Sequence, residues 1–390
     1  MTTDTSAALP EPDLALSTNL AADGGEDATT GGTGLCLSGG GYRAMVFHVG
    51  VLWRLNEAGL LPQLDRVSSV SGGSVTAGVL AMNWNRLDFD SNGVGREFGT
   101  QVVDPVRRMA SVDVDITAVL SGLGLPLVSI SDRVVKAYRK NLFGKATLQD
   151  LPDQPRFVFN ATNLESGVLM RFGKAYLGDY RVGRVFNPDL PLAVAVAASS
   201  AFPPFLSPCT VDLEHEDWVT DPGNDLTDKD FREQISLSDG GVYDNLGLQS
   251  TWNACQRILV SDAGGHMGAD PSPPTDWLRH LLRVLSVIDN QVRSLRKQQV
   301  IKAFRAGTRS GVYVGIRSDQ SDYPSAAKIT AHPSVTKKLA DVPTRLDALK
   351  PDLQEQLINW GYAISDTGLR AHVERDLPSG RLPYPNNPLT

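Results

Sequence analysis

The chain has 390 residues, of which 41% are hydrophobic and 21% are charged. This composition is typical of a globular protein with a large core, and the net charge of −7 argues against nucleic acid as the main partner. The sequence shows neither a signal-peptide pattern nor an apolar run of membrane-spanning length. Three widely spaced cysteines, Cys36, Cys209 and Cys255, indicate reduced thiols without a disulfide framework or a zinc site, which predicts a cytoplasmic protein.

Composition also suggests the domain organisation. Residues 1–31 are rich in Ala, Thr, Asp, Gly and Pro without periodicity, which predicts a disordered tail. Residues 32–390 are expected to form one domain, with insertions near 85–150 and 214–230. The first contains an apolar helical patch at 112–127. The second is rich in carboxylates but lacks the spacing of an EF-hand calcium loop, so we expect a solvated surface loop.

The first candidate functional segment is a glycine loop at residues 35–44. The apolar run before the glycines predicts a strand, and the spacing over 45–55 predicts a helix that ends near Gly59. Three glycines between a strand and a helix N-terminus offer free N–H groups to an anion. That anion could be a phosphate or the oxyanion of an acyl-transfer intermediate. Since neither G-K-[ST] nor G-x-G-x-x-G is present, the sequence favours an oxyanion hole.

A serine turn follows about thirty residues later. Residues 64–70 predict a short buried strand, and residues 75–84 predict a helix. The intervening sequence resembles the G-x-S-x-G turn of serine hydrolases, with Ser69 in place of the first glycine, and predicts that Ser71 is a nucleophile. Ser74 could compete with it, but a position one turn into the helix predicts that its hydroxyl bonds the helix backbone.

Two aspartates compete for the role of the base. Asp239 ends an apolar run, is followed by two glycines, and could accept the Ser71 proton from a poorly solvated pocket. Asp262 ends a predicted strand at 257–262 and precedes His266, which gives the alternative order serine, acid, histidine of a triad. We expect His266 to be solvated in its glycine-rich loop and His48 to be a hydrogen-bonded group of the core.

The remaining elements are predicted from periodicity. Residues 156–161 and 168–172 alternate as paired strands do, and 311–316 predict a further strand. Residues 277–306 predict a long basic amphipathic helix. Such a helix can lie on an anionic lipid surface, but the sequence favours packing of its apolar stripe on the sheet with solvated arginines outside.

The glycine loop, the serine turn and the Asp239 segment occur in the order found in patatin-like phospholipases, and the chain resembles this family. Residues 160–167 and 197–205 resemble two further segments of the family, and the glycine loop is also similar to that of cytosolic phospholipase A2 and phospholipase B enzymes. The resemblance spans residues 34–320. It implies a three-layer α/β sandwich with a central, largely parallel sheet and a Ser-Asp dyad at the carboxyl ends of the strands.

By position, the resemblance implies that Ser71 is the nucleophile and that Asp239 is its base, without a histidine. The residues implied for the oxyanion hole and its ordering are Gly39, Gly40, Gly41 and Arg43. Arg43 would either order the glycine loop or add positive charge beside it. Ser69 and Ser38 depart from the glycine and the aspartate that are common in the family, and neither change removes a reacting group.

The resemblance also implies the reaction. We expect hydrolysis of carboxyl esters in phospholipids or lysophospholipids through an acyl-serine intermediate, with no cofactor and no metal, and with transient peripheral contact to a membrane surface. The alternatives are a neutral-lipid or soluble-ester lipase, an acyltransferase, and a non-catalytic membrane-binding regulatory module. The intact serine, aspartate and glycine loop argue against the last.

Overall fold

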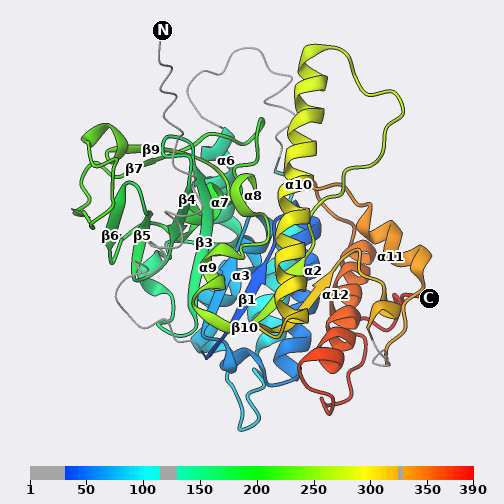
Figure 1. The fold of residues 1–390 in the computed structure, drawn as a ribbon. Helices are drawn as coiled ribbons and strands as arrows, with labels where there is room; N and C mark the ends of the chain where they lie inside the picture. Colours follow the sequence, from blue (N-terminus) through cyan, green and yellow to red (C-terminus); the bar gives the residue numbers. More distant parts are fainter. Residues whose placement is uncertain (1–30, 115–129, 324–327) are drawn as a thin grey trace.

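The computed structural model describes residues 31–114, 130–323 and 328–390. They form three layers, in which helices cover both faces of one mixed eleven-stranded sheet (Figure 1). The strand order is β11-β10-β1-β2-β3-β4-β5-β6-β8, and β9 pairs with both β3 and β7. The predicted α/β sandwich is therefore confirmed.

The first half of the sheet is parallel and consists of β11 (Ser310–Gly315), β10 (Cys255–Asp262), β1 (Gly32–Leu37), β2 (Arg66–Ser69) and β3 (Arg156–Asn163). Their buried Leu, Val and Ile side chains are typical of strands that are covered on both faces. The strands predicted at 64–70, 257–262 and 311–316 are all present.

The second half of the sheet is antiparallel. Its strands are β4 (Leu169–Phe172), β5 (Tyr176–Asp179), β6 (Gly183–Phe186), β7 (Cys209–Asp212), β8 (Trp218–Val219) and β9 (Gln234–Asp239). The predicted pairing of 156–161 with 168–172 is the contact between β3 and β4. The acidic stretch 214–230 is mostly exposed, and Asp221 and Asp225 form ion pairs with Arg184 and Arg181.

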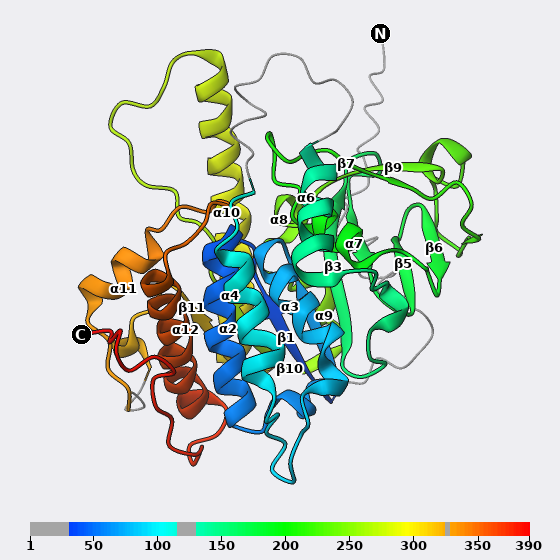
Figure 2. The same ribbon diagram turned by 180° about the vertical axis from the view of Figure 1, so that it is seen from behind.

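One face of the sheet is covered by α2 (Gly41–Glu57), α3 (Gly72–Met82), α4 (Asp104–Ala110) and α12 (Pro351–His372), as Figure 2 shows from behind. The opposite face carries α8 (Gly241–Asp244), α9 (Gln249–Trp252) and α10 (Trp277–Arg305) (Figure 1). The other helices are α6 (Ile130–Tyr138), α7 (Leu192–Ser199) and α11 (Pro333–Ala340). Shorter 3₁₀ or π turns occupy Leu61–Gln63, Trp84–Arg86, Gly99–Val103, Arg139–Phe143, Leu148–Asp150, Lys229–Phe231 and Gln320–Asp322.

Helices α2 and α12 pack against each other along their length. They approach most closely at Gly50 and Gly361, where a Cβ on either glycine would overlap a backbone carbonyl of the other helix. A buried ion pair joins Arg54 of α2 to Asp366 of α12 at 2.8 Å. The C-terminal helix is thus part of the same core as the glycine-loop helix.

The long helix predicted at 277–306 is present as α10, but its apolar stripe packs on the sheet only in the C-terminal turns around Val300, whereas Leu281, Leu285 and Ile288 are exposed. Of its side chains only Val300 and Ala303 are buried. Its N-terminal half stands clear of the sheet (Figure 1). In the middle of the helix Arg293 is turned towards the body of the protein, where it pairs with Asp262.

Several predicted features lie outside the described residues or concern absences. Residues 1–30 of the predicted tail and most of the patch at 112–127 lie outside the described residues. All three cysteines are free and buried. Across residues 31–114, 130–323 and 328–390, no helix is both long and apolar enough to cross a membrane. In the same ranges, no group of His, Cys, Asp and Glu side chains is arranged to hold a metal ion.

Candidate active site

Ser71 occupies a strained turn between β2 and α3. Its backbone has φ 53° and ψ −123°, a conformation that side-chain-bearing residues rarely adopt. Gly72 follows at the first position of α3, where a Cβ would overlap the Gly41 carbonyl. The predicted serine turn is therefore formed, with Ser71 at its apex and 8% exposed. Ser69 ends β2 without a positive φ, so this position does not require the glycine of the usual motif.

A serine from a distant helix fixes this turn. Ser199, the last residue of α7, accepts the Ser71 N–H with both its carbonyl oxygen, at 3.2 Å, and its Oγ, at 3.1 Å. The Ser199 hydroxyl in turn donates to the Asn160 carbonyl at 2.6 Å. Ser199 lies in the segment that resembles the family but was not among the predicted site residues, because sequence alone does not show which side chains α7 brings to β2.

Ser74 does not compete with Ser71. Its side chain is fully buried and its Oγ lies 3.0 Å from Ser69 Oγ and 2.8 Å from Ser199 Oγ. The prediction that this hydroxyl bonds its own helix backbone is wrong, because α3 packs where the side chains of Ser69 and Ser199 offer better partners. The Ser74 hydroxyl therefore stabilises the serine turn through its contacts with Ser69 and Ser199.

Asp239 reaches the serine turn on an antiparallel strand. Strand β2 ends where Ser69 pairs with Phe159, whereas β3 continues to Asn163. Strand β9 runs back along this extension and places Asp239 opposite Ala161. The carboxyl end of β9 thus meets the carboxyl ends of the parallel strands from the opposite direction, which the sequence did not predict.

The Asp239 carboxyl group is buried, with 2% of the residue exposed. Burial raises its pKa to about 7, while the hydrogen bond from the Gly241 N–H and the nearby Ser71 hydroxyl lower it and the Asp289 carboxylate adds to the rise. Oδ1 accepts the Gly241 N–H at 2.7 Å. Among the described residues no donor of good hydrogen-bond geometry reaches Oδ2. Asp239 therefore has a free acceptor oxygen and the basicity to take a proton near neutral pH.

The glycine loop lies directly against Ser71, since a Cβ built on Gly39 would stand 3.1 Å from Ser71 Cβ. Gly40 and Gly41 have φ 145° and 59°, which glycine adopts readily. The amides of Gly40, Gly41 and Gly72 donate to no acceptor in the described part of the chain, and Gly41 and Gly72 are the first residues of helices, whose N–H groups point outward from the helix end. These three amides are the candidate oxyanion donors.

This arrangement narrows the predicted set of oxyanion donors and adds one residue to it. The Gly39 amide donates to the Asn245 carbonyl at 3.1 Å, so of the three glycines implied for the oxyanion hole only Gly40 and Gly41 have a free N–H among the described residues. Gly72 was not predicted, although the residue after a nucleophilic serine commonly supplies such an N–H. The serine motif itself could have identified it.

Arg43 points away from the serine turn and is buried. Its guanidinium donates to the carbonyls of Ala340, Val342 and Ala263 at 2.7–3.0 Å. Burial lowers the pKa of Arg43 to about 10, and the nearby Arg317 and Arg293 add to this effect. These contacts favour the first of its two predicted roles, ordering of the glycine loop.

The alternative triad does not assemble. Asp262 accepts hydrogen bonds from the Tyr313 hydroxyl at 2.6 Å and the Gly264 N–H at 2.9 Å, and it pairs with Arg293 at 3.3 Å. His266 is exposed and is not a partner of Asp262 in these bonds. The Asp262 carboxylate is thus committed to structural contacts.

His48 is a hydrogen-bonded core residue, as predicted. Its Nε2 lies 2.9 Å from the Ser38 carbonyl and its Nδ1 lies 2.8 Å from Ser261 Oγ. A carbonyl can only accept, so Nε2 carries the proton and Nδ1 accepts from Ser261. Burial lowers the pKa of His48 to about 4, which keeps the imidazole neutral.

Comparison with known proteins identifies the family. A strained serine between a strand and a helix, beside a glycine loop and a buried carboxyl group, defines an α/β protein with a candidate acyl-transfer site. A family model described as patatin-like phospholipase matches residues 35–252, which is more than half of the chain. The chain belongs to the patatin-like phospholipase family.

The other comparisons are more distant. A search of curated proteins found no match. Human GIVD cytosolic phospholipase A2 is 14% identical with a TM-score of 0.47, and the match covers 91% of this chain and 61% of that one. VipD from Legionella pneumophila is 16% identical with a TM-score of 0.32, with coverage of 86% and 66%. The chain thus spans about three fifths of the length of the human phospholipase that it matches.

Proposed function

We propose that this protein is a lipid acyl hydrolase that cleaves carboxyl esters of phospholipids or lysophospholipids, with Ser71 as the nucleophile and Asp239 as its base. The observation that carries the proposal is a serine in a strained turn beside a buried carboxyl group whose pKa is about 7. Membership of the patatin-like phospholipase family supports the choice of a lipid substrate.

In the proposed first half-reaction, Asp239 accepts the hydroxyl proton of Ser71 while Oγ attacks the carbonyl carbon of the ester. Negative charge develops on the carbonyl oxygen, where the free amides of Gly40, Gly41 and Gly72 would stabilise it. When the tetrahedral intermediate collapses, the carbon–oxygen bond to the alcohol breaks, and Asp239 gives its proton to the departing alkoxide. The products are the free alcohol and acyl-Ser71.

The second half-reaction repeats these steps with water. Asp239 takes a proton from a water molecule as its oxygen attacks the acyl-serine, and the same amides would stabilise the second oxyanion. Collapse releases the fatty acid, and the proton on Asp239 returns to Ser71. The dyad ends in its starting protonation state, so no co-reactant other than water is consumed.

Fatty-acid release from defined lipids tests this proposal. The wild-type protein and the Ser71→Ala variant are compared on a phospholipid, a lysophospholipid, a triacylglycerol and a short-chain soluble ester. We expect release from the first two by the wild type alone, and fluorophosphonate labelling at Ser71. Labelling of Ser74 in an active preparation would contradict the assignment of the nucleophile.

The same assay separates the alternative functions. Release from triacylglycerol or soluble ester without release from phospholipid would indicate a different lipase. Transfer of the acyl group to an added alcohol in preference to water would indicate an acyltransferase. Absence of all acyl release together with absence of labelling would indicate a non-catalytic module.

A further inference from the structure

Helix α10 has the reverse of the usual orientation of an amphipathic helix. Large apolar side chains on its N-terminal part are exposed, among them Trp277 at 76%, Ile288 at 52% and Leu295 at 56%. At the helical period of 3.6 residues these positions fall on one stripe together with Leu281 and Leu285. We call these five residues the outward face of α10. A water-facing stripe of this size calls for an apolar surface that covers it.

Three basic side chains of α10 contact the body of the protein or the adjoining loop. Arg293 pairs with Asp262 and donates to the Gly265 carbonyl, and Arg283 donates to the Gly268 carbonyl at 2.8 Å. Lys297 stands over the Tyr313 ring, 4.6 Å from its centroid. These contacts fix the orientation of α10 about its axis, so the outward face remains exposed to solvent.

The outward face lies next to the candidate active site. Helix α10 packs against α8, the short helix that follows Asp239, and the Asp289 carboxylate of α10 acts on the pKa of Asp239. Exposed apolar side chains also occur on the segments beside Asp239, namely Val242 on α8 and Phe202. The Asp239 N–H donates to the Ala201 carbonyl at 2.8 Å, which places Phe202 beside the base. Exposed apolar side chains thus occur both on α10 and on the segments next to Asp239 in the chain.

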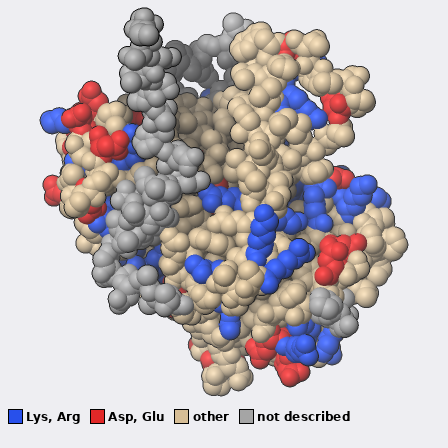
Figure 3. Space-filling view, viewed as in Figure 1, with Lys and Arg blue, Asp and Glu red and all other residues tan. Residues whose placement is uncertain are grey.

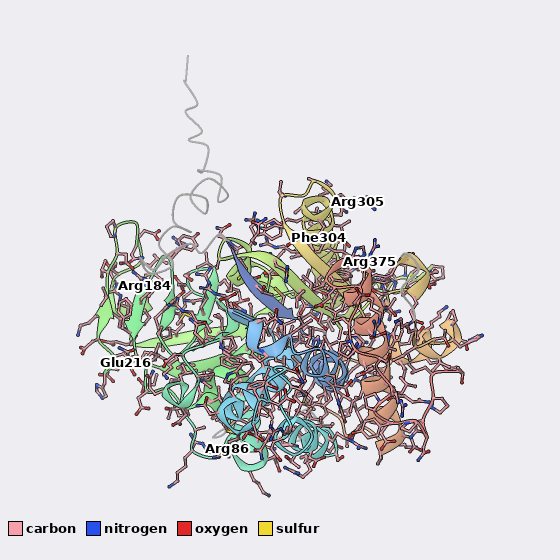
Figure 4. All side chains as sticks on the ribbon, turned by 90° about the horizontal axis from the view of Figure 1, so that it is seen from below. Arg86, Arg184, Glu216, Phe304, Arg305 and Arg375 are labelled. Atoms are coloured by element: carbon pink, nitrogen blue, oxygen red, sulfur yellow. The ribbon has the colours of Figure 1, made fainter. Side chains whose placement is uncertain are left out.

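Charge indicates which apolar surface is the partner. Helix α10 carries seven Lys and Arg residues and a single carboxylate, Asp289, so its net charge is +6 in a chain whose net charge is −7. In Figure 3 the projecting part of α10 is mostly uncharged, and blue side chains gather around its lower part. Figure 4 shows α10 from below, on one side of the sheet, with the labelled Phe304 and Arg305 at its C-terminal end. An apolar stripe with flanking positive charge matches an anionic lipid bilayer.

We propose that the outward face of α10 docks this protein on an anionic phospholipid surface and thereby brings the Ser71 site to the lipid. The proposal rests on the proposed function, because it assigns the surface from which that site takes its substrate. Docking buries the apolar stripe at the boundary between head groups and acyl chains, while the exposed Arg279, Lys302 and Arg305 of α10 can contact the anionic head groups.

Vesicle co-sedimentation tests the docking surface without any need for catalysis. The full chain with Ser71→Ala is mixed with vesicles of equal parts phosphatidylcholine and phosphatidylglycerol, and with vesicles of phosphatidylcholine alone. The face variant adds Leu281→Gln, Leu285→Gln and Ile288→Gln, since glutamine retains helix propensity. The control variant instead adds Phe186→Gln and Val219→Gln, which alter two similarly exposed apolar side chains on β6 and β8, at the end of the sheet remote from α10.

We expect the face variant to partition onto the mixed vesicles about tenfold less well or worse, because three large apolar side chains are lost from the buried stripe. The control variant should partition like its parent. Added salt should weaken partitioning of the parent, since it screens the basic side chains. Unchanged partitioning of the face variant, or an equal loss in the control variant, overturns the proposal.

Two further measurements distinguish lipid docking from dimerisation and from a failure of catalysis. If sedimentation velocity without lipid shows a dimer that the face variant dissociates, the outward face is an interface between two copies and lipid docking is wrong. In the Ser71 background, the same substitutions should leave hydrolysis of a dispersed lysophospholipid, presented without vesicles, at the wild-type rate. If the wild type cleaves no ester while partitioning still depends on α10, the proposed function fails and docking stands. If esters are cleaved and partitioning ignores α10, docking fails and the proposed function stands.

Discussion

Ser199 contacts the backbone amide of Ser71 twice, through its carbonyl oxygen at 3.2 Å and through its side-chain Oγ at 3.1 Å. The two residues are 128 positions apart in the sequence, and they lie at the ends of different helices. The same Oγ donates to the Asn160 carbonyl at 2.6 Å, so the turn that carries the candidate nucleophile is tied to strand β3. Ser199 is therefore a positioning residue for Ser71.

The first prediction follows from this contact. Ser199→Ala should lower kcat by about tenfold with little change in KM, because the turn loses a hydrogen bond that orients Ser71 while substrate contacts remain. The measurement is the rate per serine titrated with a fluorophosphonate. Ser200→Ala is the matched control, since the Ser200 hydroxyl bonds Val196 within its own helix. An unchanged rate per titrated Ser71 would show that Ser199 serves stability alone.

The second prediction concerns the strain at Ser71. Alanine normally stabilises a protein relative to glycine, but φ 53° with ψ −123° reverses this order. Ser71→Gly should therefore be more stable than Ser71→Ala by about 1 kcal/mol, which corresponds to roughly 1–2 °C in Tm for a domain of about 360 residues. Both variants should lose about 10⁴-fold or more in turnover. A Ser71→Ala variant that is the more stable of the two would refute strain at this turn.

The third prediction distinguishes the two aspartates. Asp239→Asn should reduce turnover about as severely as loss of the serine, because an amide cannot accept the hydroxyl proton. Asp262→Asn should lower Tm, since Asp262 is buried and paired with Arg293, but turnover per titrated serine should stay near normal. His266→Ala should change neither quantity. Loss of turnover in His266→Ala with activity retained in Asp239→Asn would support the triad of Ser71, Asp262 and His266 instead of the dyad.

The fourth prediction concerns pH. Asp239 must be ionised to act as the base, so kcat/KM should rise with pH through an inflection near 7, the pKa to which burial raises this carboxyl group. The free energy of unfolding changes with pH in the opposite direction, because between pH 4 and 7 the folded state binds the Asp239 proton more tightly than the unfolded state does. Wild-type stability should therefore decline across this interval relative to Asp239→Asn. A pH profile without this inflection, or an equal Tm difference at pH 5 and pH 8, would contradict the assignment.

The sequence predicted those features that depend on local signals. Glycines next to apolar runs located the turns after β1 and β2, and the order of the motifs identified Ser71 and Asp239 as candidates. Helix boundaries came out close, because Gly59 and the apolar spacing after Gly41 are short-range properties. These features could be predicted because a few neighbouring residues determine them.

Features that depend on contacts between distant segments were not predictable. The Gly39 amide is occupied by the Asn245 carbonyl, and the Ser74 hydroxyl bonds Ser199, although the spacing of the motifs indicates neither contact. The periodicity of α10 was predicted correctly, but periodicity does not reveal which face meets the protein. Only the position of Asp262 and Tyr313, beside the basic face of α10, explains why the apolar face is turned outward.

The contacts between residues 340–345 and the glycine loop have a consequence for protein engineering. The Arg345 carbonyl accepts the Tyr42 N–H at 2.9 Å, Arg43 bonds the carbonyls of Ala340 and Val342, and a Cβ on Gly41 would stand 2.6 Å from the Arg345 carbonyl. All of these partners lie beyond residue 252, where the family match ends. Residues 35–252 therefore do not contain all the contacts that shape the glycine loop. A chimera that exchanges residues 35–252 between relatives should lose the shape of its glycine loop unless residues 340–345 are exchanged as well.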